Sequence, residues 1–174
     1  VLDKYEARRF SNGGIDPHLW MSVKRAKYMI EIIRDELISL DKKNEVYYKK
    51  RSEDYLKKLD NLEEEIYNKL EPYKGKAIII YHPVLGYFLD EYGLDMVAIE
   101  KNGKKATPKR LKEIIDIAKE NNINSIFYQA TVDSKQTEVV ASEINANIVK
   151  INPLSQDYIE NMREITNKII NSYQ

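Results

Sequence analysis

Two histidines are the only imidazoles in the chain, and each lies in a short turn-forming motif. His18 belongs to the sequence Asp-Pro-His-Leu-Trp, and His82 to Tyr-His-Pro-Val-Leu-Gly, directly after an apolar run. Imidazole nitrogen is a ligand for zinc, copper, iron and nickel alike. A lone histidine beside a proline is more often a packing or capping residue. The pair is therefore a metal-site hypothesis that depends on whether the fold brings the two rings together.

Composition limits the chemistry and the partners. The 174 residues include 28 basic and 28 acidic side chains and no cysteine. A net charge of zero gives no basic footprint, so nucleic acid is not expected as a partner. Without cysteine, a metal site must use nitrogen and oxygen ligands. No apolar stretch approaches the roughly 20 residues of a membrane span, so none is expected in this segment.

The first third of the chain has helical periodicity. Apolar residues from Val23 to Leu40 follow a 3-4-3-4-3 spacing, with Ser22 as the expected N-cap. A second helix is predicted from Glu45 until Pro72 stops it. At 1.5 Å per residue this helix is about 40 Å long. Its many charges indicate a solvated face, and a strut or a coiled-coil arm would both fit.

After Gly75 short β-rich runs alternate with helical ones, which is typical of a parallel sheet with crossover helices. The fold class predicted is α/β, with a four-stranded, mostly parallel sheet. The expected strands are 77–81, 96–100, 125–128 and 147–151, and the expected helices are 83–92, 108–120, 134–144 and 155–170. Segment 101–105 is predicted to be a solvated turn.

Ligands of open parallel sheets bind at the carboxyl ends of the strands. These positions hold His82, Glu100 and Gln129, and the turn after the fourth strand carries Asp157. Of the four, His82 and Asp157 are the predicted ligands, and Pro83 is expected to present the imidazole from a stiff turn at a helix start. An acid in the first turn of a helix is also favoured by the helix dipole, and the residues alone favour that use of Asp157.

Several sequence motifs together resemble one protein family. They are Asp-Pro-His-Leu-Trp, the long charged helix, Gly-Lys-Ala-Ile-Ile-Ile-Tyr-His-Pro-Val-Leu-Gly-Tyr-Phe, Thr-Pro-Lys-Arg-Leu and Asn-Pro-Leu-Ser-Gln-Asp-Tyr. From Asp16 onward the chain is similar to the zinc/manganese substrate-binding proteins of ABC importers, cluster A-I, of the periplasmic zinc-binding type.

The resemblance implies a division of the chain. Residues 1–41 would be the end of an N-terminal lobe that carries the Asp-Pro-His segment, 42–73 the long linking helix, and 74–174 the α/β C-terminal metal-binding lobe. Most of the N-terminal lobe, with a further histidine ligand, is absent from this segment. If nothing lies upstream, three of four ligands remain, and a homo-oligomer becomes possible.

By the same resemblance, His18, His82 and Asp157 look like metal ligands. A carboxylate is common at the position of His82 in manganese-type members, so histidine favours zinc over manganese. Gln129 stands where many members have glutamate and is given no role. The implied function is a non-enzymatic, extracytoplasmic receptor that captures the ion between two lobes and delivers it to an ABC permease. Signal or anchor sequences are not seen in this segment.

Two alternatives remain open on the residues. In a zinc-dependent hydrolase, His18, His82 and Asp157 would hold the metal with water as the fourth ligand. A metal-free interaction module would pair with another chain through the long helix. Motifs of serine hydrolases, phosphate-binding loops, dinucleotide-binding folds and HExxH metalloproteases are missing from the sequence.

Overall fold

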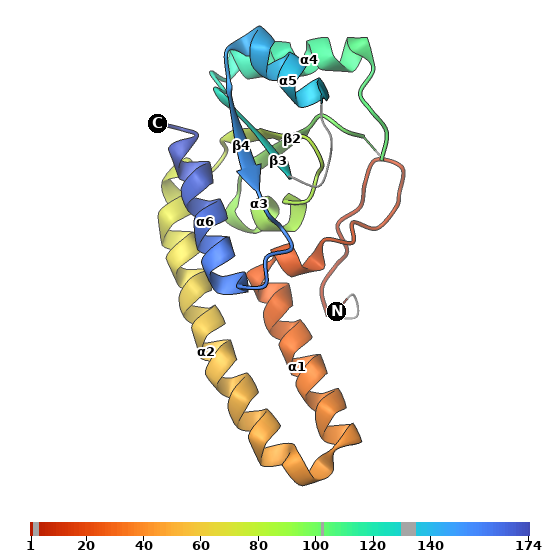
Figure 1. Ribbon diagram of the computed structural model, residues 1–174, viewed down its shortest axis with the longest axis vertical. Coiled ribbons are helices and arrows are strands. Elements are labelled where there is room, and N and C mark those ends of the chain that lie inside the picture. The colour runs from red at the N-terminus through yellow and green to blue at the C-terminus, as the bar shows by residue number, and fades with distance from the viewer. Residues whose placement is uncertain (2–3, 102, 130–134) are drawn as a thin grey trace.

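The computed structural model describes residues 1, 4–101, 103–129 and 135–174. Asn102 of the predicted turn and Ser134 at the predicted start of a helix lie outside the described residues. The chain forms an α/β body from which a pair of long helices projects as an arm (Figure 1). The predicted fold class is confirmed.

The body contains four parallel strands in the order β2-β1-β3-β4. The strands are β1 (Ala77–Ile80), β2 (Asp95–Ala98), β3 (Ser125–Gln129) and β4 (Asn147–Ile151). The chain leaves β1 toward β2 on one side, and it leaves β3 toward β4 on the other side. The carboxyl ends of β1 and β3 therefore flank a topological switch point, where ligands of open α/β sheets bind.

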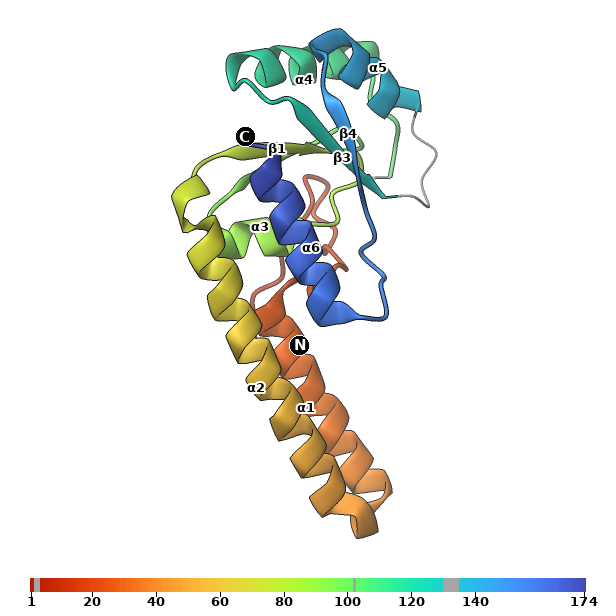
Figure 2. The ribbon, with the colours of Figure 1, turned by 60° about the vertical axis from the view of Figure 1, so that its left-hand side comes forward.

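Helices cover both faces of the sheet (Figure 2). On one face, Ile78 and Ile80 pack with residues of helices α2 (Glu45–Leu70), α3 (Gly86–Tyr92) and α6 (Tyr158–Asn171). On the other face, Ile79 and Ile126 pack with residues of α4 (Pro108–Glu120) and α5 (Lys135–Ile144). Alternation along β1 thus supplies both cores, as the two-residue period of a strand requires.

Local caps define the helix ends, and the predicted N-cap Ser22 is among them. The Ser22 hydroxyl accepts a hydrogen bond from the Arg25 amide at the start of α1 (Val23–Leu40), and Thr107 does the same for Arg110 at the start of α4. Gly93 ends α3 in the left-handed conformation, with φ of 71°. The two hydroxyls and the Gly93 backbone amide, which donates to the Leu89 carbonyl, satisfy groups that a helix end leaves unpaired.

The arm is an antiparallel pair of α1 and α2 joined by the 3-10 helix η2 (Lys42–Asn44) (Figure 1). Lys27 of α1 bonds to Asp60 and Glu63 of α2, at 2.8 and 2.5 Å. The fully buried apolar residues of α2 all lie in its C-terminal half, from Leu59 to Leu70, where the helix packs on the body. The long helix is therefore anchored at one end.

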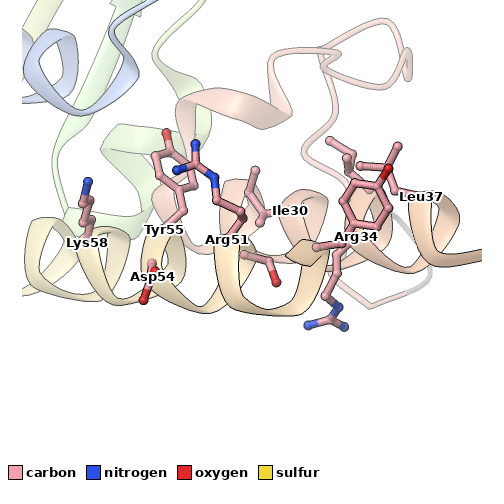
Figure 3. A pocket seen from close by; sticks show the side chains of 10 residues that line it. Ile30, Arg34, Leu37, Arg51, Asp54, Tyr55 and Lys58 are labelled. Carbon is pink, nitrogen blue, oxygen red and sulfur yellow. The ribbon is translucent and has the colours of Figure 1, made fainter. Parts of the chain in front are cut away.

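A groove of about 260 Å³ lies between α1 and α2 (Figure 3). Ile30, Leu37 and Tyr55 form its apolar wall, while Arg34 and Lys58 lie at its margin. None of the helices in the described part of the chain has the length and apolar character needed to span a membrane.

Two helix starts differ from the sequence prediction. Helix α3 begins at Gly86 rather than at Pro83, because residues 82–85 form a turn in which the Val84 amide bonds to the His82 carbonyl at 2.7 Å. Helix α6 begins at Tyr158, after the capping residue Asp157. His82 therefore lies in a turn, as expected, but the helix begins four residues after it and not at the next residue.

Candidate metal centre

The fold brings the two histidines into contact, although 64 positions separate them in the chain. The Nε2 atoms of His18 and His82 are 3.3 Å apart, and the two rings meet edge to face at an interplanar angle of 84°. The His18 side chain is 11% exposed and that of His82 is 26% exposed. The pair is thus nearly enclosed but open on the side of His82.

Asp16 fixes the ring of His18. One oxygen of this buried carboxylate accepts the His18 backbone amide at 3.0 Å and lies 2.7 Å from the His18 Nδ1. Burial alone would raise the pKa of Asp16, but the hydrogen bonds from His18 and the charges of His18 and Arg8 outweigh it and lower the pKa. The carboxylate is therefore ionised and can only accept hydrogen bonds.

Glu100 has the same relation to His82. Both of its carboxylate oxygens lie 3.2 Å from the His82 Nδ1. Backbone pairing sets this contact, because the Glu100 amide bonds to the Tyr81 carbonyl at 2.9 Å and continues the β1–β2 ladder. Each imidazole is thus held on its Nδ1 side by a carboxylate.

The carboxylates determine which ring nitrogens are free. A carboxylate accepts the Nδ1 proton, so in the neutral imidazole Nε2 carries a lone pair and no proton. Here the two Nε2 atoms face each other at 3.3 Å, a contact that two lone pairs alone would not favour. A cation placed against both nitrogens would make this arrangement favourable, and carboxylate–histidine–metal triads have this form.

The separation also fits a metal quantitatively. Two nitrogen ligands about 2.0 to 2.1 Å from zinc, at a tetrahedral angle, are about 3.3 to 3.4 Å apart. The Nε2 atoms lie at 3.3 Å. Rings at this spacing can bind one ion without a change in their separation.

Helix α3 connects the two histidines structurally. The Tyr87 hydroxyl accepts the Arg8 backbone amide at 3.0 Å and donates to the Asp16 carbonyl at 2.9 Å. The Arg8 guanidinium lies against Gly86, and it binds Asp16 at 3.2 Å and Asp90 at 2.9 Å. A Cβ at Gly86 would come within 2.6 Å of this guanidinium, so the glycine permits this close packing.

Replacement of Tyr87 by phenylalanine tests this connection. The variant leaves the Arg8 amide and the Asp16 carbonyl without their partner, so we expect a loss of about 1 to 3 kcal/mol in the free energy of unfolding. Urea unfolding measures the loss. Tyr47→Phe, at an exposed position of the arm, is the control and should change stability by less than about 0.5 kcal/mol. Equal effects in both variants would show that Tyr87 does not anchor the segment.

Glu100→Gln tests the carboxylate behind His82. The amide keeps the size of the side chain but loses the charge that holds the Nδ1 proton, so we expect zinc affinity to fall about tenfold. Competition with a chromogenic chelator measures it. Glu164→Gln removes an exposed carboxylate that pairs with Lys168 on α6 and should leave affinity unchanged. An unchanged affinity in Glu100→Gln would remove Glu100 from the site.

Asp157 occupies a different setting. Its exposed carboxylate caps α6 by accepting the Glu160 amide at 3.3 Å. The loop before it is nevertheless tied to the His18 segment, because Trp20 donates to the Pro153 carbonyl at 2.9 Å and Tyr158 donates to the Trp20 carbonyl at 2.8 Å. Among the described residues no three histidine, cysteine or acidic side chains gather closely enough to hold a metal ion.

The sequence predicted His82 as a metal ligand but assigned no role to Glu100, which contacts it, or to Asp16. The signal for Asp16 was its position two residues before His18, a spacing at which an aspartate side chain binds the backbone of a turn. The signal for Glu100 was its place just after β2, the strand adjacent to β1. Tyr87, Phe88 and Tyr92, which follow His82 at helical spacing, are buried core residues.

Comparison with known proteins places the chain in a family. A family model described as ZnuA, zinc-uptake complex component A, periplasmic, matches residues 3–172. The manganese-binding lipoprotein MntA of Halalkalibacterium halodurans is 32% identical over 78% of this chain and 46% of its own length. The high-affinity zinc uptake system protein ZnuA of Bacillus subtilis is 31% identical over 80% of this chain and 44% of its own length.

A solved structure agrees with these matches. A crystal structure of ZnuA superposes with a TM-score of 0.93 at 31% identity, over 97% of this chain and 66% of that one. In the sequence matches, this chain spans less than half the length of each of the two relatives. The family model, the sequence matches and the superposition all agree with one assignment: the chain belongs to the ZnuA family of periplasmic zinc-uptake components.

Proposed function

We propose that this chain is the metal-binding part of a solute-binding receptor of an ABC importer, and that its cargo is zinc. The observation that carries the proposal is the Nε2–Nε2 distance of 3.3 Å between His18 and His82, with a carboxylate behind each ring. Both nitrogens are oriented toward a shared position. The receptor would deliver the ion to a permease in the membrane.

Zinc is preferred over manganese because of the ligand type. Imidazole nitrogen suits zinc, whereas manganese prefers carboxylate, carbonyl and water oxygen. The names of the relatives include both metals. The two histidines among the proposed ligands of this chain support zinc.

The domain division is part of the proposal. Residues 1–41 would end an N-terminal lobe, 42–73 would link the lobes, and 74–174 would form the C-terminal lobe. The contacts of Tyr87 and Arg8 with Asp16 would then hold the His18 segment at the lobe boundary, where the metal is bound. An extracytoplasmic location follows from this function.

Native mass spectrometry with zinc or manganese tests the proposal. We expect one zinc per chain, and manganese only at a concentration at least about 100-fold higher, because the nitrogen ligands favour zinc. A chain that binds neither ion would exclude the receptor and a zinc hydrolase together. Zinc-dependent turnover of 4-nitrophenyl acetate would favour the hydrolase, and none is expected.

Asp157 is the proposed third ligand, and Asp157→Asn separates this role from capping. Asparagine is as good an N-cap as aspartate, so the melting temperature of the metal-free variant should not change. Loss of the charged oxygen should lower zinc affinity about tenfold if the carboxylate moves to bind the ion. Zinc affinity equal to that of the wild type would leave Asp157 with the capping role alone.

A further inference from the structure

A group of positive side chains surrounds a hollow next to the candidate metal centre. The hollow has a volume of about 630 Å³ and lies where the N-terminal loop meets the connection from β2 to α4 (Figure 1). Asn12, Ala106, Thr107 and Glu113 line it together with five cationic residues. These are Lys101, Lys104, Lys105, Lys109 and Arg110.

The lysines of this hollow differ from several others in the protein in that no described carboxylate pairs with them. Lys27, Lys49 and Lys168 each form an ion pair with a carboxylate. The four lysines of the hollow are exposed, and none has a carboxylate partner within the described part of the chain. The chain as a whole has a net charge of zero, so this local excess of positive charge is not a consequence of composition.

Among the described residues, the carboxylates that line the hollow or the adjoining cavity are already engaged. Glu113, the acidic residue of the hollow, lies 3.3 Å from Arg110. Glu100, in the adjoining cavity that shares Lys101, Arg110 and Glu113, holds His82. The ammonium groups are therefore available to a charged ligand, and their field repels a bare metal cation.

We propose that this hollow binds a small, multiply charged oxyanion of the phosphate or polycarboxylate class. Lysine ammonium groups on flexible stems act as point charges that adapt to such anions. The volume lies in the range of small-molecule sites, about 300 to 1,000 Å³. A concave site favours a compact anion over an extended polyanion, which would need a broad, flat surface. This binding is independent of the metal and of the proposed receptor function.

Calorimetric titration of the metal-free chain with pyrophosphate and with citrate, at constant ionic strength, tests the proposal. We expect saturable binding of at least one of them. Lys105→Glu combined with Lys109→Glu should raise its dissociation constant at least about tenfold, since attraction becomes repulsion at close range. The control variant, Lys42→Glu combined with Lys43→Glu at the exposed tip of the arm, makes the same change of net charge. Its dissociation constant should stay within about twofold of the wild-type value.

Further readouts locate the site. Amide resonances of residues 103–107 and 109–110 should shift on titration, while circular dichroism and zinc binding stay those of the wild type in both double variants. Absence of saturable binding, an equal loss in both double variants, or shifts confined to other regions would overturn the proposal. So would binding that is found only with phosphatidylglycerol vesicles or heparin, because the surface would then serve an extended polyanion.

Discussion

His82→Ala should reduce zinc affinity at least about 100-fold, because even the loss of a second-shell partner costs 10- to 100-fold. The variant removes one of two nitrogens that face each other at 3.3 Å and leaves His18 as a single imidazole ligand. The side chain is 26% exposed, so its removal also costs packing, and circular dichroism with urea unfolding of the metal-free variant serves as the control for folding. Chelator competition measures the affinity.

Thermal unfolding gives an independent readout of the same variant. A ligand at 100 times its dissociation constant stabilises the folded state by about 2.7 kcal/mol. For a chain of this size the melting temperature should therefore rise by about 5 to 10 °C when zinc is added. The rise should vanish in His82→Ala and persist in Tyr47→Ala, a change at an exposed position of the arm. A zinc-dependent rise in His82→Ala equal to that of the wild type would show that the metal binds elsewhere.

Asp16→Ala should affect both stability and metal binding. The carboxylate is fully buried and holds His18 and Arg8. Its removal leaves the His18 amide and the Arg8 guanidinium without this partner, so we expect a loss of about 3 kcal/mol in the free energy of unfolding. Zinc affinity should fall about 10- to 100-fold, because the His18 ring loses its orientation. Urea unfolding and chelator competition measure the two effects.

The pH dependence of stability separates the charge of Asp16 from its packing. Its pKa in the folded protein lies below the ordinary value of 3.8. A carboxyl with a lowered folded pKa contributes stability above its unfolded pKa and loses that contribution as the pH falls through the folded value. The difference in unfolding free energy between wild type and Asp16→Ala should therefore shrink below about pH 4. A difference that stays constant down to pH 2 would assign the effect to packing alone.

Much of the fold could be predicted because its signals are local. The spacing of apolar residues from Val23 to Leu40 depends on the 3.6-residue period, and Ser22 and Thr107 cap helices through amides three residues away. Strand β4 matches its predicted bounds of 147–151. The predicted start of α3 at Pro83 was wrong. Proline suits the first turn of a helix, but here residues 82–85 form a separate turn and the helix begins at Gly86.

The candidate site was only partly predictable because its geometry is long-range. The sequence by itself determined that His18 and His82 are the only imidazoles, and that His82 follows a strand which ends at the sheet's binding edge. The tertiary structure decided that their Nε2 atoms meet at 3.3 Å and that Asp16 and Glu100 hold the opposite sides of the rings. Periodicity and capping depend on residues a few positions apart. Contact across 64 positions depends on how α3, the N-terminal segment and the sheet pack, which no local pattern encodes.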